Sequence, residues 1–211
     1  MTPRRLLPAV LLAALLVPAA VADAKPPSCT RGGATLEEAS GNVRVVRRGL
    51  KTNGVNETRR DGLSACWAPT GKRFRVATER DFGDDLRSSS RIEIVDERYV
   101  GIVTDFVGGV SESRSAAVWD AKTRRRLHAS KACDVDQGDF SGVDDVAFLP
   151  RGGMAMSCRK LLLFRTGATK TPEQLEAGGV RSLAVTRHSH FFIARLYWTL
   201  EDGAVKFLDL S

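Results

Sequence analysis

The stretch from His190 to Leu210 reads as a strand, a turn and a second strand. Aromatic and β-branched residues fill both runs, as is typical of strands. Glu201-Asp202-Gly203 lies between them and supplies residue types that tolerate positive φ in a tight hairpin. The second run alternates between two faces, one carrying Val205 and Phe207 and the other Lys206, Leu208 and Leu210. A period of two predicts a strand that packs between layers.

Helical periodicity is scarce in the rest of the chain. After Ala24, no stretch keeps apolar residues at helical spacing for about a dozen positions. The helix-like start at Thr171-Pro172-Glu173-Gln174 is followed by Gly178-Gly179, which would end a helix after about two turns. Glycine pairs and Asn-Gly or Asp-Gly steps separate short apolar runs elsewhere. We therefore predict an all-β fold.

An aromatic residue ends an apolar run just before a turn at four places: Trp67, Trp119, Phe164 and Trp198. The spacings between them are 52, 45 and 34 residues, which bracket the ~40–50 residues of a four-stranded propeller blade. We predict a β-propeller-like repeat of about four four-stranded antiparallel blades, complete or open, with a β-sandwich as the alternative. The four aromatic side chains are expected to pack between neighbouring sheets.

The sequence of each copy of the repeat contains four candidate strands. The first copy supplies Thr35–Ala39, Asn42–Arg47, Leu63–Trp67 and Arg73–Thr78. The second supplies Arg91–Val95, Tyr99–Val107, Ser115–Trp119 and Arg124–His128. The third supplies Val143–Leu149, Met154–Arg159, Lys160–Phe164 and a short run near Leu175. The last supplies Ser182–Thr186, Phe191–Ala194, Leu196–Thr199 and Ala204–Leu210.

The last copy contains Leu196-Tyr197-Trp198-Thr199, then Asp202-Gly203 and a strand that ends in Leu208-Asp209-Leu210. In this respect it resembles a blade of the YWTD-type and related secreted β-propellers, with Leu200 standing where the family motif has Asp. The earlier copies share only the order of aromatic residue, turn and strand. Blades of that family serve mainly as protein-binding or structural scaffolds, so the resemblance implies binding rather than catalysis.

The chain begins with an export signal. Arg4 and Arg5 precede an apolar run from Leu6 to Val21, which is short of the ~20 uninterrupted residues of a membrane span and contains two prolines. We predict a signal peptide over residues 1–24 and a single domain over 25–211, which is secreted, extracellular or held in the cell envelope. Loss of two arginines and one aspartate with the signal changes the formal net charge from +7 to +6.

The four cysteines, Cys29, Cys66, Cys133 and Cys158, all lie in the exported part. An oxidising compartment lets thiols pair, so two disulfides are expected. Of the three connectivities we favour Cys29–Cys66 with Cys133–Cys158, since each pair then stays within one repeat. A zinc site would need close C-x-x-C spacing, which the sequence lacks.

The segment from Asp134 to Asp145 is the densest acidic cluster, and Asp134, Asp136, Asp139 and Asp145 are candidate calcium ligands. It departs from the EF-hand pattern because Gly138 and Asp139 are in swapped order and Asp145 replaces the bidentate Glu. A solvated acidic turn is the favoured interpretation, with calcium as the alternative and no other cofactor expected.

No linear catalytic motif is present: the sequence lacks G-x-S-x-G, H-E-x-x-H and G-x-x-x-x-G-K. His188 and His190 are two residues apart, so on a strand they would point to the same side, which is an arrangement that two metal ligands can use. The third histidine, His128, belongs to another copy. The alternative to a binding module is an extracellular hydrolase with a site drawn from several blades near Asp105, Asp145 or His190.

Basic residues gather in two of the copies. The first copy holds Arg44, Arg47, Arg48, Arg59, Arg60, Lys72, Arg73 and Arg75, and the second holds Lys122, Arg124, Arg125 and Arg126. The main interpretation is a solvated surface, but if the two groups share a face they could bind an anionic cell-wall polymer or an acidic protein. Nucleic acid is disfavoured because no base-stacking aromatics interrupt the basic runs. We predict a non-enzymatic binding or structural module that does not span a membrane once the signal is removed.

Overall fold

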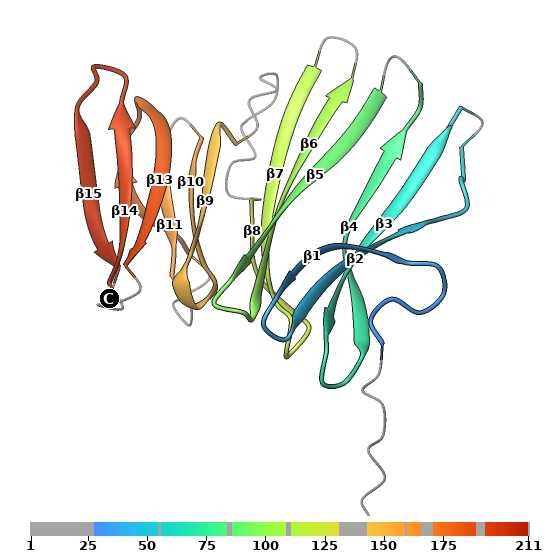
Figure 1. The fold of residues 1–211 in the computed structure, drawn as a ribbon. Helices are drawn as coiled ribbons and strands as arrows, with labels where there is room; N and C mark the ends of the chain where they lie inside the picture. Colours follow the sequence, from blue (N-terminus) through green and yellow to red (C-terminus); the bar gives the residue numbers. More distant parts are fainter. Residues whose placement is uncertain are drawn as a thin grey trace, which may run out of the picture.

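The computed structural model describes residues 28–54, 56–83, 86–108, 111–130, 143–158, 160–165, 171–188 and 193–210 (Figure 1). Within these ranges the fold is all-β, as predicted: there is no α-helix, and a short 3-10 segment occurs at Pro150–Gly152. None of the described residues forms a helix long and apolar enough to cross a membrane.

Among the described residues, fifteen strands follow one another in sequence order. The first eight are β1 Thr35–Ser40, β2 Val43–Gly49, β3 Arg59–Trp67, β4 Lys72–Asp81, β5 Leu86–Val95, β6 Tyr99–Gly108, β7 Ser111–Asp120 and β8 Arg125–Ala129. The remaining seven are β9 Asp145–Leu149, β10 Gly153–Ser157, β11 Leu161–Phe164, β12 Glu173–Glu176, β13 Val180–His188, β14 Ile193–Leu200 and β15 Val205–Leu210.

Strands β1 to β8 form one antiparallel meander in which each strand pairs with the next. The meander is weakly connected between β4 and β5, which pair through Asp81 and Arg87 alone. In contrast, β3 pairs with β4 along its whole length. We therefore call β1–β4 the first sheet and β5–β8 the second sheet. The third sheet has the order β12-β11-β10-β9, and the fourth is β13-β14-β15.

The four sheets succeed one another across the molecule and pack face to face (Figure 1). The first and second sheets enclose a cluster that includes Val45 and Ile102. The second and third enclose Val103 with Phe148, and the third and fourth enclose Leu163 with Leu196. Three successive apolar layers therefore lie between the four sheets.

Close approach of the second and third sheets depends on a glycine. A Cβ on Gly101 of β6 would lie 2.4 Å from the ring of Phe148 on β9, well inside van der Waals contact. Phe148 is buried, and its ring occupies the space that any larger residue at position 101 would need. Gly101 thus sets the separation of these two layers.

The four aromatics of the repeat pack between sheets, as expected. Trp198 is buried against the third sheet, and Phe164 is buried against the second. The Trp119 ring lies 5.6 Å from that of Phe74 on the first sheet. Trp67 differs from these three, because it packs toward the sheet that follows it in the chain rather than the one that precedes it. The spacing of the four aromatic residues therefore places one of them in each sheet. It does not predict toward which neighbouring sheet each ring points.

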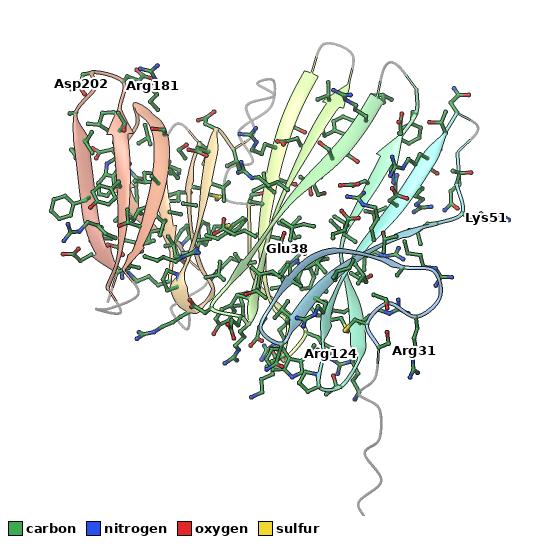
Figure 2. All side chains as sticks on the ribbon, in the orientation of Figure 1. Arg31, Glu38, Lys51, Arg124, Arg181 and Asp202 are labelled. Atoms are coloured by element: carbon green, nitrogen blue, oxygen red, sulfur yellow. A yellow bond between two sulfur atoms is a disulfide. The ribbon has the colours of Figure 1, made fainter. Side chains whose placement is uncertain are left out.

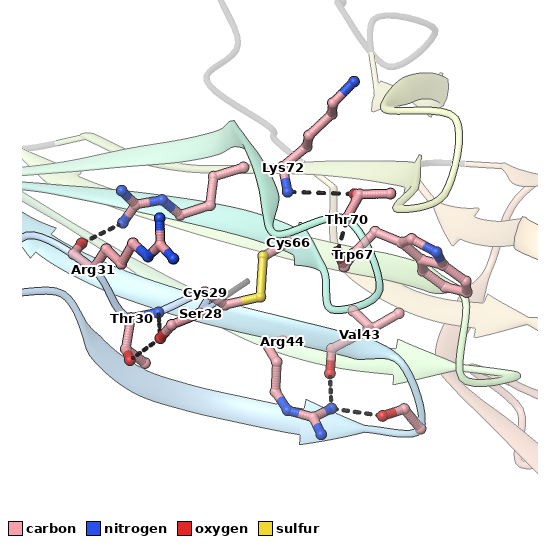
Figure 3. Close-up of a disulfide and its surroundings, with 12 residues drawn as sticks. Ser28, Cys29, Thr30, Arg31, Val43, Arg44, Cys66, Trp67, Thr70 and Lys72 are labelled. Atoms are coloured by element: carbon pink, nitrogen blue, oxygen red, sulfur yellow. Dashed lines mark hydrogen bonds between the residues drawn. A yellow bond between two sulfur atoms is a disulfide. The ribbon is translucent and has the colours of Figure 1, made fainter. Parts of the chain in front are cut away.

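A disulfide joins the N-terminal segment to the first sheet. Cys29 and Cys66 are bonded, as predicted, and Cys66 lies near the end of β3 (Figure 3). Both residues are buried with Ala34 and Val46, so the bond covers the outer face of this sheet. Cys158 is also disulfide-bonded. Its predicted partner, Cys133, lies outside the described residues.

The last copy differs from the prediction. The candidates Phe191–Ala194 and Leu196–Thr199 are not two strands: their described residues belong to the single strand β14, so the fourth sheet has three described strands. Arg195 does not interrupt the strand because it points to one face while Ala194 and Leu196 point to the buried one. The outer face of this sheet exposes Val205 and Phe207, so β15 is not packed on both sides within the described residues.

The sheets do not close into a ring within the described residues. The strand order leaves β1, β8, β9, β12, β13 and β15 as edge strands. The stack of layers is also compatible with the predicted alternative, a sandwich-like β fold. The signal-peptide prediction for residues 1–24 lies outside the described part of the chain.

We expect Trp198→Ala to lower the free energy of unfolding by ~3–5 kcal/mol, because it leaves a cavity between the third and fourth sheets. Thermal unfolding followed by circular dichroism measures the change. Arg125→Ala, at an exposed position, is the control and should melt as the wild type does. A wild-type melting temperature for Trp198→Ala would contradict the packing of the two sheets.

Candidate functional site

The predicted binding residues Arg124, Arg125 and Arg126 lie at the turn between β7 and β8 and at the start of β8 (Figure 2). All three are exposed, and none has an acidic partner among the described residues. The Arg126 guanidinium lies 5.8 Å from the centre of the Trp119 ring, on which it makes a cation–π contact. The charges of these arginines are therefore available to a partner.

Lys72 brings a cation from the first sheet to the same region. It begins β4, two residues before Phe74, whose ring contacts Trp119. Lys72 and Lys122 are exposed and also lack an acidic partner in the described part of the chain. We call Lys72, Lys122, Arg124, Arg125 and Arg126 the basic turn surface.

The turn between β7 and β8, which carries the part of this surface from Lys122 to Arg126, is built around Asp120. Its buried carboxylate accepts hydrogen bonds from the backbone N–H groups of Lys122 and Thr123, and Arg98 donates to both of its oxygens. Burial opposes the charge of Asp120, but the hydrogen bonds from Arg98 and Thr123 outweigh it and hold the pKa of this carboxyl below its ordinary value. The backbone of the turn is therefore fixed by a group other than the exposed arginines.

Arg124 adopts a backbone conformation that the turn would give more readily to glycine. Its φ is 61°, in the left-handed region. This conformation costs a residue with a Cβ roughly 1–2 kcal/mol relative to the right-handed region. The arginine at this position is thus unfavourable for the turn itself.

The basic residues of the first copy do not form one patch. Arg47 pairs with Glu37 on β1, Asp61 on β3 and Glu79 on β4. Burial works against the charge of Arg47, but the hydrogen bonds that it donates to Glu79 and Glu37 outweigh burial and raise its pKa. Arg59 pairs with Asp61. Other members bond the backbone: Arg44 donates to the carbonyl of Val43, and Arg73 to that of Arg31 (Figure 3). Much of this predicted basic group therefore stabilises the first sheet.

A charged pocket of about 90 Å³ lies at the opposite end of the first sheet from the basic turn surface. It is lined by residues from the start of β3, the end of β4 and the start of β5: Arg59, Asp61, Glu79, Arg80, Asp81, Arg87 and Ser88. The volume is enough for a few water molecules or one small polar group. We call these seven residues the charged pocket.

Sequence reasoning identified only Arg59 among these seven, as part of a basic patch. Asp61 and Glu79 are opposite one another in the β3–β4 register, and Asp81 is opposite Arg87 in the β4–β5 register. The available signal was the mixed charge at the ends of successive strands, in Arg-Arg-Asp at 59–61 and Glu-Arg-Asp at 79–81. This charge pattern indicates a pocket only when the pairing of β3, β4 and β5 is known.

The calcium prediction falls mostly outside the described residues, since Asp134, Asp136 and Asp139 lie in the segment 131–142. Asp145 is described, and both of its carboxylate oxygens accept backbone hydrogen bonds, from Val146 at 2.8 Å and from Leu183 at 2.7 Å. The second bond ties β9 to β13, so Asp145 joins the third and fourth sheets. No group of three metal-ligating side chains occurs among the residues that the structure describes.

The residues named for an assembled catalytic site are not brought together in the described structure. Asp105 pairs with Arg114 at 2.6 Å, whereas Asp145 links two other sheets. His190 lies outside the described residues, and only the backbone of His188 is described.

His128 is half-buried on β8, with its ring 5.5 Å from that of Phe164. Its buried Nε2 has no hydrogen-bond partner among the described residues. Burial lowers the pKa of this imidazole, because the charged form would lose its hydration. His128 therefore acts as a neutral part of the layer between the second and third sheets.

The lowered pKa of His128 makes stability depend on pH. The unfolded state, with an ordinary pKa of about 6.5, binds the proton more readily, so stability is full above that pH and falls as the pH drops toward the folded-state value. We expect the melting temperature of the wild type to fall more between about pH 7.5 and about pH 5 than that of His128→Phe, which keeps the ring contact but does not titrate. Equal falls in the two proteins would show that His128 is not the group responsible.

No known protein family matches the sequence, and no curated protein matches it. One solved structure similar to the chain is an α-L-arabinofuranosidase from Fusarium graminearum in complex with an iminosugar inhibitor. The sequence identity is 8%, the TM-score is 0.38, and the match covers 84% of this chain but 56% of that one, a little over half its length. A likeness at this level supports no conclusion about the fold or the function of the present chain.

Proposed function

We propose that the protein is an exported, non-enzymatic β-repeat module that binds an anionic polymer of the cell surface through the basic turn surface. The observation that carries the proposal is the set of five exposed cations, contributed by two adjacent sheets, that have no acidic partner among the described residues. Exposed charges of one sign raise the local concentration of an oppositely charged polymer.

The positive φ of Arg124 supports this assignment. The turn itself uses this conformation, because the Arg124 N–H donates a hydrogen bond to the Asp120 carbonyl at 2.7 Å. The turn does not need an arginine there, however, and a residue with a Cβ in this strained region is a reason to suspect a role in binding. Asp120 already fixes the turn, so the side chain of Arg124 contributes nothing visible to folding. A cation at the tip of the turn is, in contrast, well placed to contact an extended anionic chain.

We further propose that the four sheets are successive blades of a propeller-like repeat. The support is their order along the chain, their face-to-face packing and the aromatic side chain that each contributes to an interlayer contact. Such a scaffold holds the β3–β4 and β7–β8 turns side by side through the contact between Phe74 and Trp119.

Export is supported by two features. The basic residues and apolar run at the start of the sequence have the form of a signal peptide. The Cys29–Cys66 disulfide is the kind of bond that persists in an oxidising compartment. A polymer of the cell surface is accessible from that compartment.

The first test measures binding to polyphosphate and to poly-L-glutamate by fluorescence anisotropy at increasing salt. We expect binding that weakens with salt, and a loss of about tenfold when Arg124, Arg125 and Arg126 are all changed to Gln, since three exposed contacts at ~0.5 kcal/mol each sum to about one decade. The matched control changes Lys51, Arg91 and Arg181 to Gln, which removes the same charge from exposed positions elsewhere. No binding by the wild type, or equal losses in the two variants, would overturn the proposal.

The second test separates binding from folding at one residue. We expect Arg124→Gly to keep or raise the melting temperature, because glycine adopts a φ of 61° without strain, and at the same time to weaken polyanion binding. Arg125→Gly, within strand β8, should instead lower the melting temperature. If Arg124→Gly bound the polyanions as tightly as the wild type, the proposed role of Arg124 would be wrong.

A further inference from the structure

The charged pocket exists because β4 and β5 separate. Asp81 and Arg87 form the single backbone pair between these strands. Beyond that pair, hydrogen bonds that involve side chains join β4 to β5 in place of backbone pairing. The Ser88 hydroxyl accepts a hydrogen bond from the N–H of Arg80 at 2.8 Å, and a Glu79 oxygen accepts one from the N–H of Ser90 at 2.6 Å. The pocket opens where the backbones have moved apart.

The carboxylates of the pocket are largely occupied by donors from the protein. One oxygen of Glu79 is bonded to Ser90 and the other to Arg47. One oxygen of Asp61 receives Arg59 through two nitrogens, at 2.6 and 2.8 Å. One oxygen of Asp81 accepts from the N–H of Gly83 at 2.9 Å. Few acceptor sites are left for a ligand.

The donors of the pocket are largely free. The Arg87 side chain is exposed and has no hydrogen-bond or ion-pair partner among the described residues. The Arg80 guanidinium forms an ion pair with Glu57, but at 3.9 Å the two groups are beyond hydrogen-bond distance, so none of its N–H groups donates a hydrogen bond among the described residues. The Ser88 hydroxyl uses its oxygen as an acceptor, so its hydrogen can still be donated.

We propose that the charged pocket binds a single anionic group, a carboxylate or a phosphate, through Arg80, Arg87 and Ser88. The planar fork of a guanidinium matches both groups in geometry, and a hydroxyl can complete the contact. The lining carries three arginines and three acidic residues, so selectivity comes from the free donors rather than from net charge. The site is separate from the basic turn surface and does not depend on the polymer proposal.

The test is isothermal titration of the full-length exported protein with inorganic phosphate, acetate and glycerol. We expect phosphate or acetate to bind, and Arg87→Gln to weaken that binding by roughly tenfold, the usual effect of losing hydrogen bonds to a charged group. The Arg87 side chain takes no part in the internal bonds of the pocket, so this variant should keep the backbone pair with Asp81 and the wild-type melting temperature. Arg91→Gln is the matched control, because Arg91 is another exposed arginine on β5 without an acidic partner among the described residues.

The choice of ligands identifies the group that is recognised. Binding of phosphate alone assigns a phosphoryl group, binding of acetate alone assigns a carboxylate, and binding of both supports a general anion site. Glycerol binding as tight as that of the anions, no binding of either anion, or equal losses in Arg87→Gln and Arg91→Gln would each overturn the proposal. The variant with Gln at positions 124, 125 and 126 should keep the phosphate or acetate affinity, which separates this site from the basic turn surface.

Discussion

Apolar packing on both faces of the inner sheets is the interaction on which the rest of the structure depends. The short strand β11, Leu161–Phe164, is buried at all four residues, with Leu161 and Leu163 facing the fourth sheet and Leu162 and Phe164 facing the second. A strand covered on both sides reads as a continuous apolar run rather than an alternating one. Layers of this kind must come close together, and Gly101 beneath the Phe148 ring shows how little space separates them.

Polar groups between the first two sheets are tolerated because they are paired across strands. Arg47 joins carboxylates from β1, β3 and β4, and the Asp61 side chain among them is only 9% exposed. Removing a carboxylate from water costs several kcal/mol unless an opposite charge and hydrogen bonds replace the lost hydration. The network therefore lets the apolar layer between these sheets end in a charged region, and that region borders the pocket.

Much of the fold could be predicted from local patterns, whereas the pocket could not. The period of two and the turn residues place β2, β6 and β15 close to their observed positions, because both signals are read within a few residues. The same reasoning divided β14 at Arg195, since a charged residue in an apolar run is ambiguous until the buried face is known. Asp61, Glu79 and Arg87 line the same pocket only because β3, β4 and β5 pair in a particular register. The sequence of a single strand does not determine that register.

The arginines show most clearly why composition alone is a poor guide to this protein. Arg47 and Arg59 look in the sequence like members of a binding patch, yet their carboxylate partners on neighbouring strands make them part of the first sheet. Arg87 and Arg124 have no such partner among the described residues, and Arg124 also takes an unfavourable φ. A bonded counter-charge therefore identifies the cations that serve folding, and an unpaired cation is assigned to recognition only where a second feature, such as the pocket beside Arg87 or the φ of Arg124, supports it. That partition separates the two proposed sites from a background of basic residues that serve the scaffold.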